Sequence, residues 1–144
     1  MATVRSVLKN KGNQVWSLSP DATVLDALKL MAEKGVGAVL VIDGDQLVGI
    51  FSERDYARRG VLMGRGVEAT MDQMMTSPVL AINPDRTMED VQAIMTDHHF
   101  RHLPVMEDGK VIGLVSIGDV VKSIIDEQAN HISGLENYIM GRRN

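Results

Sequence analysis

The sequence predicts an α+β fold built from two copies of one unit and followed by a C-terminal helix. The pattern Gly-x-x-Ser-x-x-Asp occurs at residues 49–55 and again at residues 113–119. Many identities recur 64 positions apart, as Pro20 and Pro84 do. The same order of strand, helix and hairpin patterns accompanies both copies. An internal duplication explains all three observations.

Composition limits the class of protein. With 144 residues, 44% of them hydrophobic, the chain can form one compact domain or two small halves that share a core. The absence of cysteine excludes disulfides and thiolate chemistry and leads us to expect a cytoplasmic protein. A net charge of −4 and few aromatic residues argue against nucleic-acid binding. The longest apolar run, residues 36–42, is too short to cross a membrane.

The chain opens with helical spacing. Apolar residues share a helical face within residues 3–8, a polar loop is expected at 9–13, and residues 15–18 have strand character. Thr23 is expected to cap a second helix, and Gly35 suits the C-terminal cap of that helix.

A hairpin and a third helix complete the first copy. Two apolar runs, residues 38–42 and 47–51, flank Asp-Gly-Asp at 43–45, which favours an antiparallel pair. Residues 52–59 then have a helical pattern, and Gly60 is expected to end it.

The second copy repeats this order after a glycine-containing loop. Its expected elements are the loop at 61–66, a short helix at 68–75, a strand at 79–82, a helix that starts at Thr87, and hairpin strands at 103–106 and 111–115.

The duplicated Ser-x-x-Asp pattern has two interpretations. It matches a capping box, in which the Ser oxygen and the Asp carboxylate accept bonds from the backbone N–H groups of a helix start. It also suits ligand binding, because Ser and free N–H groups can hold a phosphate while Asp accepts bonds from ribose hydroxyls. Both interpretations stay open at the level of sequence.

These motifs give the chain a resemblance to a known family. Over residues 10–125 it resembles a tandem pair of cystathionine-β-synthase (CBS) domains, a Bateman module. The signals are the two Gly-x-x-Ser-x-x-Asp stretches, Ser-Pro-Asp-Ala-Thr-Val at 19–24, Asn-Pro-Asp-Arg-Thr-Met at 83–88 and His-Leu-Pro-Val at 102–105. The resemblance implies two β-α-β-β-α repeats packed about a pseudo-two-fold axis, with a ligand cleft on each side. The expected domains are an N-terminal helix and loop at 1–14, repeat 1 at 15–66, repeat 2 at 67–125 and a C-terminal helical extension at 126–144.

The resemblance also implies ligands and site residues. Members of this family bind adenine nucleotides or related adenosyl compounds, so AMP, ADP, ATP and NAD are the expected ligands. The first cleft would combine Ser52, Arg54, Asp55, Thr76, Val79, Ala81, Arg101 and His102. The second cleft would combine Gly12, Val15, Val36, Gly37, Ala38, Ser116 and Asp119. In each, Asp would bind the ribose diol and apolar residues would take the base.

The two expected clefts differ in charge. At a spacing of 64, Gly37-Ala38 stands opposite Arg101-His102, and Lys11-Gly12 stands opposite Met75-Thr76. We therefore expect fewer phosphate contacts in the second cleft, which should favour a dinucleotide or bind more weakly.

Two other clusters carry less information. The histidines at 98, 99 and 102 lack the Cys or spaced carboxylates that would complete a metal site. Arg58 and Arg59 fit a solvated helix face as well as they fit a phosphate contact. That alternative stays open.

The chain ends in a heptad pattern. The positions that alternate in steps of four and three are Val121, Ile125, Gln128, Ile132, Leu135 and Ile139. Such a narrow seam predicts a partner helix, most simply from a second copy of the chain in a homodimer. The alternative is that the helix folds back onto its own domain.

The function expected from these features is regulatory and not enzymatic. The sequence lacks a nucleophile–base pair and a Walker-type loop, which argues against an enzyme acting on nucleotides. We expect a sensor that binds adenosine-containing nucleotides and passes their presence to an unidentified protein in signal transduction. The alternatives are an inert oligomerisation domain and a nucleotide-acting enzyme.

Overall fold

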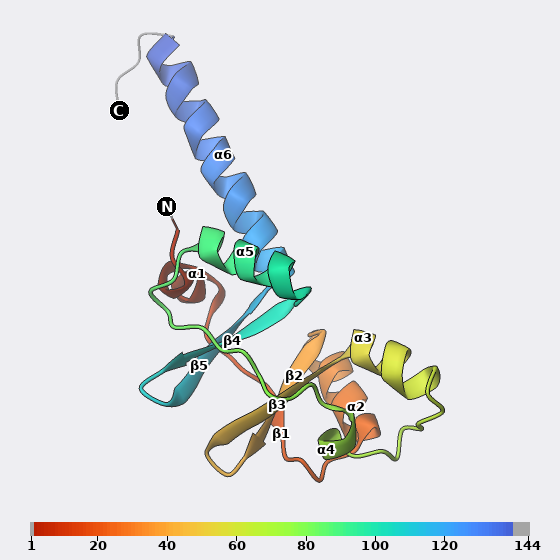
Figure 1. The fold of residues 1–144 in the computed structure, drawn as a ribbon. Coiled ribbons are helices and arrows are strands. Elements are labelled where there is room, and N and C mark those ends of the chain that lie inside the picture. Colours follow the sequence, from red (N-terminus) through yellow and green to blue (C-terminus); the bar gives the residue numbers. More distant parts are fainter. Residues whose placement is uncertain (1, 140–144) are drawn as a thin grey trace. The chain divides into compact units, whose positions relative to one another are not determined.

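The computed structural model describes residues 2–139, and these residues form two compact units (Figure 1). Unit 1 contains the described residues of 1–13, 82–105 and 113–144, and unit 2 contains residues 14–81 and 106–112. No helix among the described residues is long and apolar enough to span a membrane. The mixed α+β character predicted from the sequence is confirmed.

Unit 2 holds a three-stranded sheet covered by helices. Its elements are β1 (Ser17–Leu18), α2 (Val24–Lys34), β2 (Ala38–Asp43), β3 (Gln46–Ser52), α3 (Glu53–Asp55), the π-helix η1 (Tyr56–Val61) and α4 (Met71–Met74). Strand β2 pairs with β1 in parallel and with β3 antiparallel, so the predicted hairpin is present. The apolar core consists of Val24, Ala27, Met31, Val39, Val41, Phe51, Ala69, Met71 and Met74.

Unit 1 repeats the helix and hairpin and adds the long C-terminal helix. Its elements are α1 (Val4–Lys11), α5 (Met88–His98), α6 (Ile117–Ile139), and most of β4 (His102–Glu107) and β5 (Lys110–Ser116). Strands β4 and β5 form a two-stranded sheet. Of the predicted C-terminal extension, residues 140–144 lie outside the described residues.

The predicted helix caps of the two copies are confirmed. Thr23 starts α2 and Thr87 starts α5, and each makes a reciprocal pair of bonds with an Asp three residues later. At the other end, Gly35 follows α2 in the left-handed conformation with φ 66°, and His99 follows α5 with φ 59°. His99 therefore adopts the backbone conformation that the first copy gives to glycine.

The capping box of α2 makes a small part of stability depend on pH. The backbone N–H of Thr23 donates to the carboxylate of Asp26, and this bond holds the pKa of Asp26 below its ordinary value. The resulting stability is present above that ordinary value. It is lost as the pH falls through the lowered pKa of the folded state.

Each unit takes its opening helix from the other copy of the sequence repeat. In unit 2, the N–H of Val24 donates to the carbonyl of Ala69, just before α4. In unit 1, the N–H of Met88 donates to the carbonyl of Ala2, just before α1. Helix α1 is therefore the structural counterpart of α4. The two donors, Val24 and Met88, are 64 positions apart in the sequence, whereas the two acceptors, Ala2 and Ala69, are 67 positions apart.

This shift corrects one predicted equivalence. The constant spacing of 64 does not hold at the N-terminus, because α1 has 8 residues and α4 has 4. Met75 packs against Gly49, and Leu8 makes the equivalent contact with Gly113. Leu8, and not Lys11, is thus the counterpart of Met75.

Three predicted elements are shorter than expected or absent, namely the strands expected at 15–18 and 79–82 and the helix expected at 68–75. The strand expected at 79–82 is wrong, since only Ile82 makes a parallel bridge, to Val105, before the chain turns at Pro84. The same bridge in the first copy joins Leu18 to Val41, within a β1 of 2 residues. The helix expected at 68–75 covers only the residues of α4, because Thr70 is its N-cap.

Two helices run further than expected. Helix α1 continues to Lys11 into the predicted polar loop. The helix after Ser52 does not end at Gly60 but passes through it as a π-helix to Val61. A Cβ at Gly60 would lie 2.7 Å from the Tyr56 ring, so glycine provides room for that ring inside the widened turn and does not act as a stop.

The Gly49 contact yields a stability prediction. A Cβ at this position would lie 2.3 Å from Sδ of Met75 and 2.9 Å from its Cβ, so the side chain of Met75 must move out of its place. We expect Gly49→Ala to lower the free energy of unfolding in urea by about 1–3 kcal/mol. Gly37→Ala is the matched control, because nothing lies within 4 Å of a Cβ there. Equal losses in both variants would contradict the packing role of Gly49.

Candidate functional site

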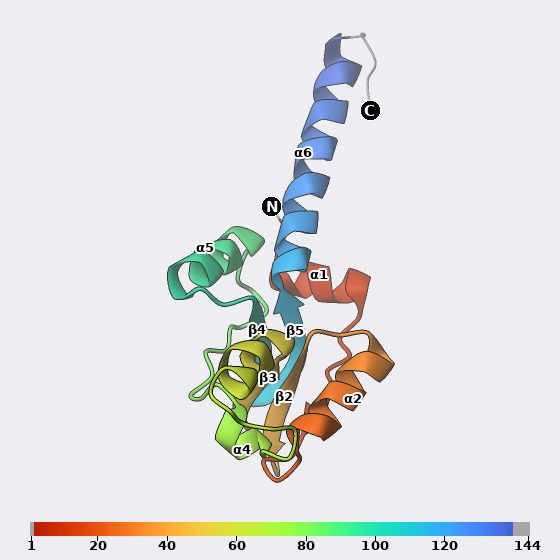
Figure 2. The ribbon, with the colours of Figure 1, turned by 90° about the vertical axis from the view of Figure 1, so that its right-hand side faces the viewer.

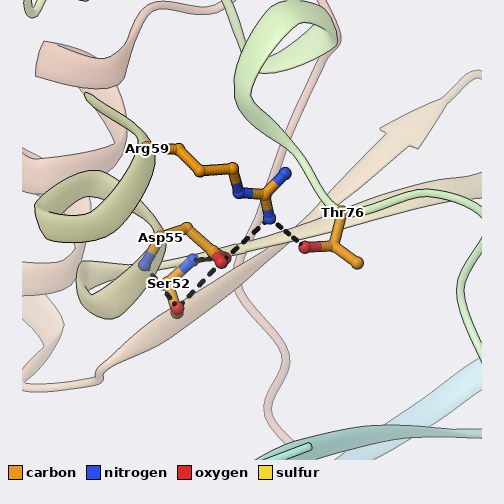
Figure 3. A network of polar contacts seen from close by, with 4 residues as sticks. All are labelled: Ser52, Asp55, Arg59 and Thr76. Atoms are coloured by element: carbon orange, nitrogen blue, oxygen red, sulfur yellow. Dashed lines mark hydrogen bonds and ion pairs between the residues drawn. The ribbon is translucent and has the colours of Figure 1, made fainter. Parts of the chain in front are cut away.

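Ser52 and Asp55 lie where β3 passes into α3. The N–H of Asp55 donates to Oγ of Ser52 at 3.2 Å, and the N–H of Ser52 donates to Oδ2 of Asp55 at 2.9 Å. The Ser52 hydroxyl also donates to Oδ2, at 3.0 Å (Figure 3). The capping interpretation of this motif is therefore confirmed. The second carboxylate oxygen, Oδ1, faces away from these bonds toward a third residue.

That third residue is Arg59. Its Nη2 donates to Oδ1 of Asp55 at 3.0 Å and also to the hydroxyl of Thr76 (Figure 3). Thr76 is held beside β3 because its backbone exchanges two hydrogen bonds with Ile50. Two segments of the chain, the helix that follows Ser52 and the residues that follow α4, thus meet at one guanidinium. The Asp55 side chain is 23% exposed and that of Arg59 is 40% exposed, so solvent and small solutes reach the pair.

The second copy builds a similar arrangement in unit 1. The N–H of Ser116 donates to Oδ2 of Asp119 at 2.8 Å, and the N–H of Asp119 donates to Oγ of Ser116 at 3.2 Å. Nζ of Lys11, from the last turn of α1, lies 2.7 Å from the same Oδ2. It also donates to the carbonyl of Leu114 at 3.0 Å.

The two sites therefore share one chemical plan. Each has a helix-capping carboxylate paired with a cation from another turn or segment, and each pair is partly open to solvent. A carboxylate accepts bonds from hydroxyl groups, while the cation attracts anionic oxygens. The cations differ, because the guanidinium of Arg59 can bind two oxygens side by side whereas the ammonium of Lys11 acts as a point charge.

The remaining residues predicted for the first cleft are divided between the units. Arg54 is exposed next to Asp55, and Val79 and Ala81 are half-buried in unit 2. Arg101 and His102 belong to unit 1, where the carbonyl of Arg101 accepts a bond from the N–H of Ile117. Their participation in one site with Asp55 stays a prediction.

The second predicted cleft is divided in the same way. Gly12 follows α1 in unit 1, together with Ser116 and Asp119. The members of this predicted set in unit 2 are Val15, Val36, Gly37 and Ala38. The carbonyl of Gly37 accepts a bond from the N–H of Glu53, as Arg101 does for Ile117. A joint site of these residues also stays a prediction.

Two cations were not assigned by the sequence motifs. From the sequence, Arg59 fits a solvated face as well as a phosphate contact, although its position four residues after Asp55 favours an ion pair on a helix. The predicted second cleft does not include Lys11, which stands 108 residues from Asp119 in the sequence. Only the placement of α1 beside β5 reveals it.

Comparison with known proteins identifies the repeat. The family model described as "CBS domain" matches residues 4–61 and again residues 71–126. Both matches begin within or at the opening helices α1 and α4, in agreement with the equivalence of these helices.

Individual relatives agree with this match. The mitochondrial CBS domain-containing protein CBSX3 of Arabidopsis thaliana is 37% identical over 96% of this chain and 72% of its own length. A protein with CBS domains from Burkholderia ambifaria MC40-6 is 46% identical, with a TM-score of 0.84 over 88% of this chain and 96% of that one. The structure of CBSX2 in complex with AMP is 28% identical, with a TM-score of 0.70 over 89% of this chain and 99% of that one.

The capping geometry yields a prediction that does not depend on any ligand. Ser52→Ala removes the oxygen that accepts the N–H of Asp55, so it should lower the free energy of unfolding by about 1 kcal/mol. Ser17→Ala, on an exposed residue of β1, is the control and should change little. Urea denaturation without nucleotide measures both. If Ser52→Ala left the free energy of unfolding unchanged, the reciprocal bonds would not stabilise α3.

Proposed function

The chain belongs to the CBS-domain family, and from this premise we propose that it is a non-catalytic regulatory module that binds adenosine-containing ligands. The relative CBSX2 was solved in complex with AMP, which supports this ligand class. Binding would be reported to a downstream protein that is still to be identified.

The observation that carries the proposal is the carboxylate–cation pair of Asp55 and Arg59. A nucleoside monophosphate can satisfy both partners when it separates them. Its ribose hydroxyls donate to the carboxylate, and its phosphate oxygens accept from the guanidinium. An inorganic anion would satisfy only the cation, and a free nucleoside only the carboxylate. The pair thus favours a ligand that carries a diol and a phosphate together.

The proposed base site is apolar. The half-buried side chains of Val79 and Ala81 lie in the same unit as Asp55, on the chain that follows Thr76. In this proposal they contact the adenine ring, and backbone amides and carbonyls read its edge. Arg101 and His102 would add phosphate contacts from the other sequence repeat, which extends the ligand class from AMP to ADP and ATP.

The Asp119 site is proposed to have a different preference. Its cation is Lys11, which is paired with Asp119. In this proposal Lys11 takes over part of the role that Arg101 and His102 have at the Asp55 site. A single ammonium forms fewer directed bonds to a phosphate than a guanidinium does. We therefore keep the expectation that this site takes a dinucleotide such as NAD or binds AMP more weakly.

Two further features belong to the proposal. We propose that the module acts as a homodimer. The reason is an apolar stripe on α6 whose side chains are each at least half exposed, formed by Val121, Ile125, Ile132 and Leu135. We also keep the cytoplasm as its proposed location. An inert oligomerisation domain remains the alternative, and it would bind no nucleotide at all.

The first prediction of this proposal separates binding from catalysis. AMP, ATP and NAD should each raise the melting temperature in a concentration-dependent manner, because a ligand that binds the native state stabilises it. Chromatography after incubation should return each nucleotide intact. Steady conversion at a rate proportional to protein concentration would identify an enzyme. The absence of any melting shift would favour the oligomerisation domain.

The second prediction tests the ion pair. Arg59→Gln should weaken AMP binding by roughly ten- to a hundred-fold, because a charged hydrogen bond contributes about 1.5–3 kcal/mol. Adenosine should bind equally well or more tightly, since Asp55 no longer has to release a cation before it accepts the ribose. Titration calorimetry with both ligands gives the two affinities.

The matched control for this variant is Arg58→Gln. Arg58 is exposed and precedes Arg59 directly, so the substitution makes the same change in net charge at almost the same place. It should alter AMP affinity only slightly. Equal losses of AMP affinity in the two variants would mean that Arg59 acts only through its long-range charge. A loss of adenosine binding in Arg59→Gln would show that Arg59 maintains the structure of the site and does not bind the phosphate.

A further inference from the structure

Helix α6 presents an apolar stripe to solvent. Val121, Ile125, Ile132 and Leu135 are between 50% and 57% exposed, and Gln128 occupies the middle of the series. At 100° per residue these five positions fall within an arc of about 80° on the helix surface. The side chain of Ile139, the last predicted member of the series, lies outside the described side chains.

Unit 1 covers a different face of the same helix. Val120 and Ser123 are 1% and 7% exposed, and Glu127 accepts a bond from the N–H of Ala2. These positions are centred roughly 120° around the helix from the stripe. Figures 1 and 2 both show α6 continuing well past α1 and α5, its neighbours in unit 1. The stripe is therefore not the surface by which α6 is anchored.

The outer half of α6 needs support from packing. It contains Asn130, Ser133 and Gly134, which are poor helix formers, and every described residue from Ile125 to Leu135 is exposed. An isolated helical segment of this length and composition is marginal in water without a partner. Because α6 nevertheless continues through this segment to a total of 23 residues, its apolar stripe is expected to be covered in the assembled protein.

We infer that the stripe is covered by α6 of a second copy, in a parallel, in-register two-helix coiled coil. The inference deepens the homodimer proposed above and is independent of ligand binding. The alternation of four and three residues is self-complementary, because the same series on a second helix supplies the matching side chains.

Gln128 selects the parallel orientation. In a parallel pair in register it meets Gln128 of the other copy, and the two amides can bond to each other. In either antiparallel register that aligns the apolar series, Gln128 faces Ile125 or Ile132, and its amide is buried without a partner. The flanking positions are also compatible, since Ile124 meets Ala129 across a parallel pair and no like charges are brought together there.

The absence of cysteine from the chain permits a direct test on the full-length protein. Leu135→Cys places a single thiol in the proposed seam, where parallel helices bring the two copies within disulfide distance. Mild oxidation should convert most of this variant to a covalent dimer. Asn130→Cys, on the opposite face of α6, is the matched control and should remain largely uncrosslinked.

A second pair of variants measures association without oxidation. Ile132→Asp buries a charge in the seam and should weaken self-association at least ten-fold by analytical ultracentrifugation. Asn130→Asp adds the same charge on the outer face and should associate as the unmodified protein does. Both should retain their nucleotide-induced melting shift, so that loss of the dimer is distinguished from loss of the binding site.

Three outcomes would overturn the inference. The first is a monomeric unmodified protein in which Leu135→Cys does not crosslink. The second is a dimer that Ile132→Asp leaves intact, which would place the interface elsewhere. The third is crosslinking between Ile125→Cys and Leu135→Cys copies in a mixture while Leu135→Cys alone does not crosslink, which would show antiparallel helices.

Discussion

The reciprocal bonding of Ser52 with Asp55, and of Ser116 with Asp119, is the interaction on which both candidate sites depend. In each case a carboxylate that caps a helix is also the partner of a cation. The capping bonds occupy one face of the carboxylate in the Asp55 site and leave Oδ1 to Arg59. The motif thus combines a structural and a chemical role, and replacement of Asp alone would disturb both. Replacement of Arg59 or Lys11 addresses the chemical role separately.

The duplication has a further structural consequence. Because α1 packs in unit 1 and α4 in unit 2, each sequence repeat contributes its opening helix to the unit that contains most of the other repeat. This exchange brings Lys11 to Asp119 and the segment after α4, with Thr76, to Arg59. Each site therefore needs residues from both repeats. One repeat by itself would lack the cation or the threonine that completes its own carboxylate site.

The sequence predicted most of the fold because its signals were local. Thr23 and Gly35 define the ends of α2 through cap geometry, and the Asp-Gly-Asp turn defines the first hairpin. Sequence reasoning failed where tertiary contacts decide the structure. Gly60 resembles a helix stop but accommodates the ring of Tyr56. The approach of Lys11 to Asp119 follows from the packing of α1, and no periodicity in the chain reports it. The domain boundaries and the composite clefts stay predictions, because they concern the joint arrangement of both repeats.

A structure of the AMP complex at high resolution tests the central claim most directly. We predict that the ribose hydroxyls lie within hydrogen-bond distance of the Asp55 carboxylate and that the phosphate oxygens accept bonds from the Arg59 guanidinium, with the direct Asp55–Arg59 bond broken. AMP bound while that ion pair remains intact, or with its phosphate directed away from Arg59, would contradict it.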